Sequence, residues 1–348
     1  MQNIAIVGFK FMGTTHAQVL QSLDHANLAA IVDRNPSQAA EYQKSLGLKL
    51  PVYPSLKSLL SEVEVDAIDI CVPTDAHLGV ALEAISAGKH LFCEKPLTLN
   101  MEDAQTLCEA VQHGGVMAQV GHCIRFWPEY QALAGLVQSR IEGKLLSLDM
   151  KRRSARPPNN GRNWLNHEEC SGGAALDLHI HDTDFISSLF GTPQAVTSIG
   201  TKDETGWSQI HTLYHYEDVA AAAEGGWNSP STWEFQMAFR AVFERATVDY
   251  DSRSRPTLSI TREGEETQPL PFGATPLDQS ASGLGNITDL GGYRNELGYF
   301  IDCLERGESP LIATPEQAME SLRIVLAEIQ SAELGRTIRL SSLGNVTS

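Results

Sequence analysis

The sequence predicts an α/β fold in which a doubly wound parallel sheet precedes an α+β domain with an open, mostly antiparallel sheet. Short apolar runs alternate with helical patterns through residue 121, which is typical of a parallel sheet covered by helices. From 194 to 261 five or six strand-like runs follow one another without long helices, which favours antiparallel pairing. The chain has 348 residues, more than one core needs, so we expect domains at 1–122 and 123–348.

The amino-acid composition of the chain argues against two classes of binding partner. Lys and Arg total 26 against 43 Asp and Glu, a formal net charge of −17, which argues against nucleic acid or an anionic membrane as partner. No apolar run approaches the length of about 18 residues that spans a membrane, and no basic segment leads into an apolar core. The six cysteines are scattered, with no C-x-x-C pair, which is typical of free thiols in a reducing cytoplasm.

The first element is an apolar, β-branched run at 3–7, followed by a glycine turn and a helical pattern. Strand, glycine turn and helix are the context of a dinucleotide-binding fingerprint. Gly8 permits the tight turn and Gly13 close packing of the helix on the strand. Lys10 replaces the middle glycine, and its ammonium could contact phosphates instead; a purely structural turn is the alternative. The candidate cofactor contacts in this turn are Gly8, Lys10, Phe11, Met12 and Gly13.

The second strand, 28–32, ends in Asp33 and Arg34. An acidic residue about 20 positions beyond the fingerprint accepts hydrogen bonds from the adenosine ribose. Asp33 favours NAD because a carboxylate repels the 2′-phosphate of NADP. Arg34 keeps NADP possible, since its guanidinium could pair with that phosphate. The alternative for Asp33 is an ordinary turn acid.

The third to fifth strands complete the parallel pattern. Helical patterns at 36–46 and 55–62 precede an apolar strand at 67–72. The turn that follows contains Pro73, Thr74 and His77 and opens a helix that runs to Gly88. A strand at 91–93, a helix at 100–113 and a strand at 116–120 follow.

The strand at 91–93 ends in Glu94, Lys95 and Pro96. The carboxyl edge of a parallel sheet is where α/β folds bind ligands, so an ammonium is placed there. Pro96 restricts the backbone of Lys95. The alternative is a solvated pair of surface charges.

Beyond residue 121 the pattern changes. A helix at 129–140, a strand near 145–154 and a polar loop at 152–163 lead to a segment in which Asp177 and His181 are four residues apart. On a helix they share one face, and Asp184 would extend that face. The alternative is a solvated helix surface. Two helices, 293–306 and 315–334, follow a polar loop at 263–292.

A zinc site in this segment is also conceivable. Its ligands would come from Asp177, His179 and His181, with His167 or Cys170. His179 and His181 are two apart on a helix and therefore point to different faces. We expect no metal.

Taken together, these motifs resemble the glucose–fructose oxidoreductase / inositol dehydrogenase / MocA (Gfo/Idh/MocA) family. The resemblance rests on the glycine turn with His16 after it, Asp33, the Pro73–His77 turn, Glu94-Lys95-Pro96 and the Gly172–His181 segment. It implies a Rossmann domain, NAD or NADP as cofactor, and hydride transfer to or from a carbinol carbon of a sugar or cyclitol. It also implies dimers or tetramers that pair through the open sheet.

The resemblance further implies that Lys95 and His181 line the reacting carbon, with Asp177 beside them. Glu94 and Lys95, with Pro73, Thr74 and His77, would line the cofactor. Arg125, Arg153 and Trp164 are candidate substrate contacts beside Asp177 and His181. An NAD-retaining glycosidase or lyase of the same fold is an alternative, as is a non-catalytic sensor of nucleotide or sugar.

Overall fold

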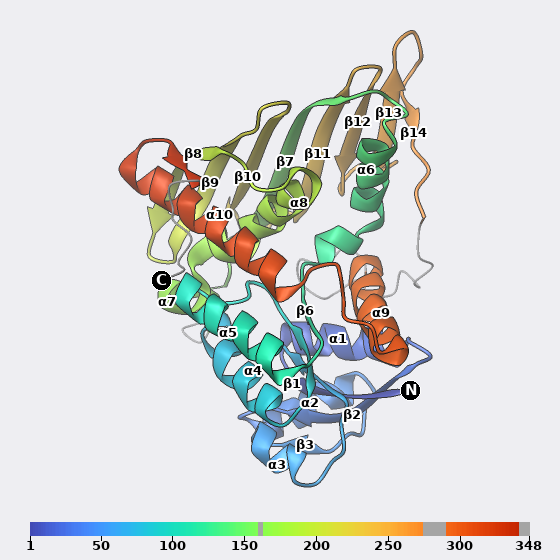
Figure 1. Cartoon of the computed structure of the whole chain (residues 1–348), viewed down its shortest axis with the longest axis vertical. Helices are drawn as coiled ribbons and strands as arrows, with labels where there is room; N and C mark the ends of the chain where they lie inside the picture. The colour runs from blue at the N-terminus through green and yellow to red at the C-terminus, as the bar shows by residue number, and fades with distance from the viewer. Residues whose placement is uncertain (159–162, 274–289, 341–348) are drawn as a thin grey trace. The chain divides into compact units, whose positions relative to one another are not determined.

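The computed structural model describes residues 1–158, 163–273 and 290–340, and these divide into two compact units. The first unit contains residues 1–126 and 290–319, and the second contains the described residues of 127–273 together with 320–340. Parts of the two predicted polar loops, 159–162 and 274–289, lie outside the described residues. Figure 1 follows the chain by colour from one end to the other.

A six-stranded parallel sheet forms the centre of the first unit, in the order β3-β2-β1-β4-β5-β6. The strands are β1 Gln2–Val7, β2 Ala26–Val32, β3 Val52–Tyr53, β4 Ala67–Ile70, β5 His90–Cys93 and β6 Ala118–Val120. The order reverses at β1, whose neighbours are β2 and β4. Ligands of open α/β sheets bind beyond the carboxyl ends of the strands at this reversal. The predicted doubly wound sheet is confirmed.

Helices connect these strands and one more joins them from far along the chain. They are α1 Phe11–Gln21, α2 Pro36–Ser45, α3 Leu56–Leu60, α4 His77–Ser86, α5 Met101–Gly114 and α9 Gly291–Arg306, with short 3-10 turns η1 Thr74–Ala76 and η2 Cys123–Phe126. The segment after α5 turns at Gly115, which has a φ of 63°, a conformation that glycine adopts without strain.

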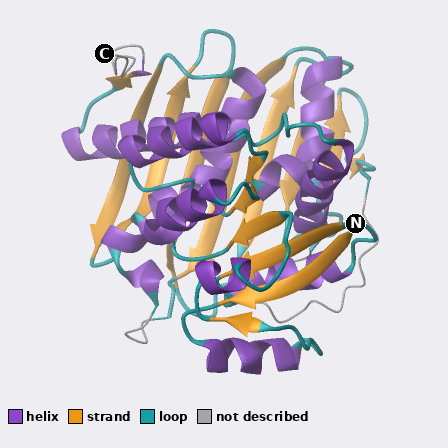
Figure 2. Ribbon diagram, turned by 60° about the horizontal axis from the view of Figure 1, so that its bottom comes forward, coloured by secondary structure: helices purple, strands orange, loops and turns teal. Residues whose placement is uncertain are grey.

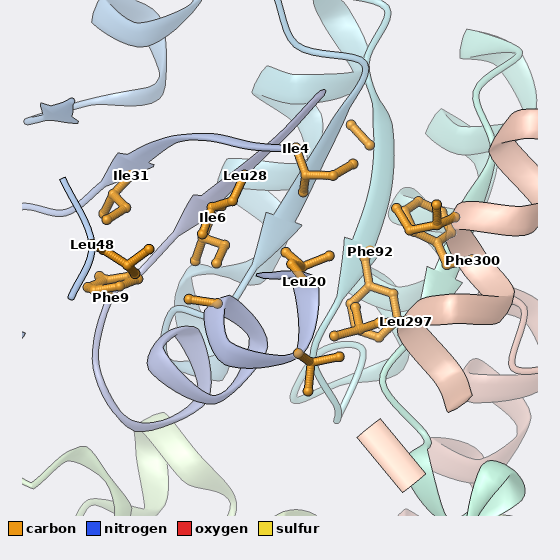
Figure 3. Close-up of a cluster of buried hydrophobic side chains, with 14 of the residues drawn as sticks. Ile4, Ile6, Phe9, Leu20, Leu28, Ile31, Leu48, Phe92, Leu297 and Phe300 are labelled. Atoms are coloured by element: carbon orange, nitrogen blue, oxygen red, sulfur yellow. The ribbon is translucent and has the colours of Figure 1, made fainter. Parts of the chain in front are cut away.

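Helix α9 completes the apolar core of the first unit. Phe92 of β5 lies against Leu297 and Phe300 of α9, and the two phenylalanine rings meet edge to face with centroids 5.7 Å apart (Figure 3). All three side chains are buried, and each contributes roughly 1.5–3 kcal/mol by leaving water. The predicted boundary at residue 122 therefore does not account for this return of the chain to the first unit.

The second unit is built on a nine-stranded sheet in the order β14-β13-β12-β11-β7-β10-β9-β8-β15. The strands are β7 Leu145–Ala155, β8 Ala195–Asp203, β9 Gly206–His215, β10 Ala220–Ser229, β11 Gln236–Phe243, β12 Ala246–Asp251, β13 Leu258–Arg262, β14 Gln268–Pro269 and β15 Ile338–Arg339. Only β7 and β10 run parallel to each other among these pairs of described strands. The predicted mostly antiparallel sheet is confirmed.

Helices of the second unit lie on one face of its sheet (Figure 2). They are α6 Pro128–Ser139, α7 Glu168–Ser171, the π-helical turn η4 Ala175–His179, α8 Ile180–Phe190 and α10 Pro315–Leu334 from residue 320 onward, with a 3-10 turn η3 Trp164–Asn166. Tyr130 of α6 packs edge to face on Phe239 of β11. Arg152 of β7 donates to Asp182 of α8 at 2.7 Å, and both side chains are buried.

The opposite face of this sheet, which we call the open face, carries exposed side chains. Along β7 to β10 these exposed residues alternate with buried ones. Ile199 of β8 lies opposite His211 of β9, and Thr197 of β8 lies opposite Leu213 of β9. Ile199 is 70% exposed and Leu213 is 59% exposed. Among the described residues no helix is both long and apolar enough to cross a membrane.

Candidate functional site

The glycine turn after β1 has the geometry that a dinucleotide fingerprint needs. Gly8 has a φ of +94°, and a Cβ at Gly13 would lie 2.1 Å from the carbonyl oxygen of Gly8. Neither position therefore admits a side chain without rearrangement. Lys10 precedes α1 and is exposed, Phe11 is 43% exposed, and Met12 is partly buried. The peptide groups of the turn stand at the amino end of α1, where the helix dipole favours an anion.

Asp33 joins the end of β2 to this turn. Its Oδ2 accepts a hydrogen bond from the Phe9 backbone N–H at 2.9 Å, and its Oδ1 accepts one from the Asn35 N–H at 2.8 Å. Each carboxylate oxygen keeps a second lone pair, so the anchored side chain can also accept from a ribose hydroxyl. Arg34 is exposed beside it.

The turn after β4 contains one unsatisfied buried hydroxyl and one buried histidine. Thr74 is 3% exposed, and its Oγ1 has no hydrogen-bond partner in the described part of the chain. Such an orphaned group fits a bound hydroxyl or carboxamide. His77 is buried, with Nδ1 3.0 Å from the carbonyl oxygen of Pro96 and Nε2 3.0 Å from that of Val72. Burial lowers the pKa of His77. The ring therefore ties the turn to the strand end that carries Lys95.

Lys95 follows the carboxyl end of β5 and is partly buried. Its backbone N–H donates to Oε2 of Glu94 at 3.1 Å, and the other oxygen of Glu94 lies 3.1 Å from Nε2 of His16. Gly121 makes room for this carboxylate, because a Cβ there would lie 2.9 Å from Glu94 Oε1. The predicted Glu94–Lys95 pair is thus not a pair of solvated surface charges, since Glu94 is 5% exposed.

Sequence reasoning missed two buried acids near Glu94. Asp69 is 1% exposed and contacts His16, while Glu296 of α9 is fully buried. The signal for Asp69 was a charged residue inside an otherwise apolar strand, Ala67-Ile-Asp-Ile70. Ligand atoms of His16, Glu94 and Glu296 all lie within 4.8 Å of one another, as do those of His16, Asp69 and Cys71.

Arg125 also lies in the first unit, on η2. Its Nη1 donates to Oε1 of Gln317 at 2.6 Å, and the same oxygen accepts the Ala313 N–H at 2.8 Å. The guanidinium is therefore fixed by Gln317 in the first turn of α10, rather than freely extended. Its candidate role as a substrate contact remains a proposal.

In the second unit, Asp177 and His181 lie on consecutive helical segments. Asp177 is partly exposed within the π-helical turn η4, and His181, which is 9% exposed, is the second residue of α8. Single π turns within helices often mark functional sites. Asp184, which was predicted to extend this face, does not reach solvent. Asp184 is fully buried and accepts a hydrogen bond from Ser321 of α10 at 2.8 Å.

His179 has surroundings different from those of His181. It is fully buried, with Nε2 2.7 Å from Oε2 of Glu328 of α10. Glu328 also accepts hydrogen bonds from Thr183 and Thr212, each at 3.0 Å. This network fixes η4 against the sheet. In the described residues, the groups whose ligand atoms converge closely enough for a metal include neither Asp177 nor His181.

The structure does not bring Arg153 together with Asp177 and His181. Arg152 points to the face on which α8 lies, because it contacts Asp182. Arg153, the next residue of β7, therefore points to the open face. There it donates to Glu224 of β10 through Nε at 2.7 Å and also through Nη2. Its assignment as a substrate contact is corrected accordingly. Trp164, on η3, is partly exposed.

Comparison with known proteins gives matches in both units. A sequence model described as an oxidoreductase family with an NAD-binding Rossmann fold matches residues 2–122, and one described as the GFO/IDH/MocA C-terminal domain matches residues 130–249. Myo-inositol 2-dehydrogenase of Thermotoga maritima is 32% identical over 188 residues, which cover 54% of this chain and 54% of that protein. The match thus spans about half the length of that relative.

More distant matches cover nearly the whole chain. The scyllo-inositol 2-dehydrogenase (NAD(+)) of Bacillus subtilis is 24% identical over 97% of this chain and 95% of its own length. Among solved structures, levoglucosan dehydrogenase in complex with NADH and levoglucosan superposes with a TM-score of 0.81 at 21% identity, over 98% of this chain and 100% of that one. At this identity the superposition establishes the fold.

Proposed function

We propose, from the premise that this chain belongs to the GFO/IDH/MocA oxidoreductase family, that it is a dehydrogenase of sugars or cyclitols. It would transfer a hydride between a nicotinamide cofactor and a carbinol carbon. Residues 2–122 are an NAD-binding Rossmann domain. The observation that carries the proposal is Lys95, held at the carboxyl end of β5 by the bond from its N–H to Glu94.

The cofactor residues fit NAD. The backbone of the Gly8–Gly13 turn would hold the pyrophosphate, Asp33 the adenosine ribose, and the orphaned Thr74 hydroxyl a polar group of the nicotinamide half. When bound, nicotinamide supplies the site that accepts or gives the hydride. Glu94, Pro73 and His77 would act indirectly, by fixing the strand end and the turn. We keep Lys10 as a phosphate contact, because this exposed residue immediately precedes α1.

Lys95, Asp177 and His181 are the residues to which we assign the proton chemistry. Oxidation of an alcohol requires a base for the hydroxyl proton while hydride leaves the same carbon. Imidazole exchanges protons near neutral pH, and we assign that step to His181. The Lys95 ammonium would stabilise the developing alkoxide. Asp177, on the preceding π turn, would orient the substrate or stabilise a protonated imidazole.

A screen of sugars, inositols and their keto forms with NAD and NADP, followed by nicotinamide absorbance, tests the proposal. We expect turnover with at least one polyol. His181→Ala should lower kcat/KM by about 10²–10⁴-fold, the range for a lost general base, and should remove the acidic limb of its pH profile. His113→Ala is the matched control, since His113 is exposed on α5 and bonds only its own helix backbone among the contacts described.

Two outcomes would favour other functions of this fold. NAD that copurifies and does not exchange would indicate the glycosidase or lyase alternative. Binding without turnover, together with a His181→Ala variant that binds as wild type does, would indicate a sensor.

A His181→Ala variant that melts as wild type does and keeps its pH profile would contradict the assignment of His181 as the proton acceptor. Lys95 would then become the leading candidate for that role.

We also propose that two or four copies of the chain pair through the open face in the cytoplasm. Ile199 and Leu213 place exposed apolar surface on adjacent strands of that face, and such surface favours association. The Ile199→Asp and Leu213→Asp double variant should shift the mass measured by light scattering to that of a monomer. An unchanged mass would place the interface elsewhere.

A further inference from the structure

His16 stands between two carboxylates in the interior of the first unit. It lies on α1, immediately after the glycine turn, and is fully buried. Nδ1 is 2.9 Å from Oδ2 and 3.0 Å from Oδ1 of Asp69, and Nε2 is 3.1 Å from Oε1 of Glu94. A neutral imidazole carries a proton on one nitrogen and a lone pair on the other. Here that lone pair would face a carboxylate oxygen, a repulsion that an imidazolium, protonated on both nitrogens, avoids.

A third carboxyl group stands beside this pair. Glu296 of α9 is fully buried, and neither of its side-chain oxygens has a hydrogen-bond partner among the described residues. Its carboxyl lies within 4.8 Å of the ligand atoms of His16 and Glu94. An ionised Glu296 would leave three buried negative charges around one positive charge, which is costly in a low-dielectric interior. A neutral carboxylic acid avoids that charge.

The surroundings of His16 contain no second cation among the described groups that face it. Asp69 lies on β4, and Cys71, just after β4, has its Sγ 3.3 Å from Nδ1. Cys93 ends β5 and Glu94 follows it. Helix α9 contributes Glu296 and Tyr293, whose ring centroid is 6.2 Å from that of His16. Cys123 of η2 contacts Tyr293. Burial raises the pKa of both Cys71 and Tyr293, so these groups stay neutral.

We propose that Asp69, His16, Glu94 and Glu296 form one buried cluster of ionisable groups, in which His16 is a lasting imidazolium and Glu296 a carboxylic acid. This cluster fixes the backbone of Lys95 through Glu94. Through His16 it also joins the Lys95 backbone to α1 and thus to the glycine turn. We class its four members as positioning residues, because the bond between the cluster and Lys95 runs from the Lys95 backbone N–H to Glu94. The link to Lys95 rests on the proposed function, whereas the protonation states do not.

The direction of each pKa shift agrees with this assignment. Burial would lower the pKa of His16, but the neighbouring Asp69 carboxylate opposes burial, and the pKa is raised well above its ordinary value. Burial would raise the pKa of Glu94, but the hydrogen bond and charge of His16 lower it. Burial, followed by the charge of Glu94, raises the pKa of Glu296 well above its ordinary value.

These directions fix the sign of the pH dependence. Glu296 stays protonated in the folded chain at pH values where the unfolded chain has lost that proton. Its contribution to stability therefore falls as pH rises from the ordinary pKa of about 4.5 to the raised one. The contribution of His16 is complete below about pH 6.5 and is lost only as pH passes its raised pKa.

The first test concerns Glu296 and uses thermal melts. Glu296→Gln mimics the neutral acid, so we expect its Tm to lie within about 2 °C of wild type near pH 5 and to gain on wild type as pH rises toward about 9. Glu296→Ala, which leaves a cavity, should melt lower at every pH. A Glu296→Gln variant that melts well below wild type at every pH would overturn the assignment. If a chelator also lowered the wild-type Tm, Glu296 would instead be an ionised ligand of a bound cation.

The second test concerns His16 and uses nitrogen NMR of histidine-labelled protein. We expect both ring N–H signals of His16, at imidazolium shifts, to persist to about pH 9, far above the ordinary titration near pH 6.5. In Asp69→Asn, which keeps an acceptor oxygen but removes the charge, the same signals should titrate within about two pH units of that ordinary value. A wild-type His16 that is singly protonated at pH 7 would refute the proposal.

The third test concerns Lys95 and uses kinetics. Glu94→Ala, which removes the acceptor of the Lys95 N–H, should lower kcat by about 10²-fold while NAD binding stays within about threefold. Glu94→Gln should restore most of that loss. Equal kcat for wild type and Glu94→Ala would refute the link to Lys95. If wild type turned over no sugar, the proposed function would fail while the melts and NMR still decided the protonation states.

Discussion

Replacing Asp33 by Asn should remove the preference for NAD over NADP. Asp33 is anchored by backbone N–H groups of Phe9 and Asn35, at 2.9 and 2.8 Å, so its charge cannot swing away from a 2′-phosphate. A phosphate that replaced the ribose hydroxyl would bring like charges within about 4 Å. One unit charge pair at that separation costs about 1 kcal/mol in bulk water and about 4 kcal/mol at an effective dielectric constant of 20.

Asp33 is neither fully exposed nor buried, so its repulsion of a 2′-phosphate should cost an amount between these two values. Arg34 offsets part of it, by up to about 1 kcal/mol as an exposed cation. We therefore expect wild type to bind NAD more tightly than NADP by about 1–3 kcal/mol, or roughly 5- to 150-fold in Kd. In Asp33→Asn the difference should shrink to within about threefold. NAD binding itself should weaken by about 0.5–1.5 kcal/mol, because the amide nitrogen cannot accept one of the two backbone bonds.

Calorimetric titration of each nucleotide measures this without knowledge of the substrate. Asp66→Asn is the matched control, since Asp66 is an exposed carboxylate that accepts the Asn3 N–H at 2.6 Å, before the amino end of β4. It should leave both affinities unchanged. Tighter binding of NADP by wild type, or a ratio unaltered in Asp33→Asn, would refute the reasoning and direct attention to Arg34.

Three further predictions concern chemistry and packing. Lys95→Ala should bind NAD nearly as wild type does but lose about 10²-fold or more in kcat, as for a lost transition-state donor; near-normal turnover would make Lys95 structural. Gly225→Ala should lower the free energy of unfolding by about 1–3 kcal/mol, because the new Cβ would lie 2.6 Å from Cβ of His179. An unchanged Tm would show that η4 can shift away from β10 at no cost. Phe300→Ala should cost about 3–5 kcal/mol, seen as a lower Tm, because its ring packs on Phe92; a loss below about 1 kcal/mol would contradict that packing.

Much of the first unit could be predicted because its determinants are local. Strands and helices alternate along the chain, and every two successive strands except β3 and β4 pair with each other, so the periods of the apolar pattern indicate the fold. Gly8 and Gly13 could be recognised because their roles depend only on backbone geometry at a strand-to-helix turn. Asp33 could be placed because the strand before it fixes where its carboxylate lies.

The missed features depend on information that periodicity lacks. Asp184 was expected to extend the face of Asp177 and His181, but its burial depends on Ser321 of α10, which lies 137 residues later in the chain. Arg153 and Arg152 differ only in strand parity, and the sequence does not tell which parity faces the helices. Glu296 lies on an amphipathic helix whose packing partner is about 200 residues away, beyond the reach of any local pattern.

The return of α9 to the first unit also bears on how the chain folds during synthesis. The strands of the first sheet end at Val120, but the helix that covers Phe92 begins at Gly291. A ribosome must therefore make most of the second unit before the first can bury that surface. Until then, the apolar side of β5 and the carboxylate of Glu94 would remain accessible to water and to chaperones. The contact between Phe92 and Phe300 spans 208 residues, a separation that favours slow closure. Because α9 is made late, we expect chaperones to bind chains that stall before residue 291, through the apolar surface that α9 would otherwise cover.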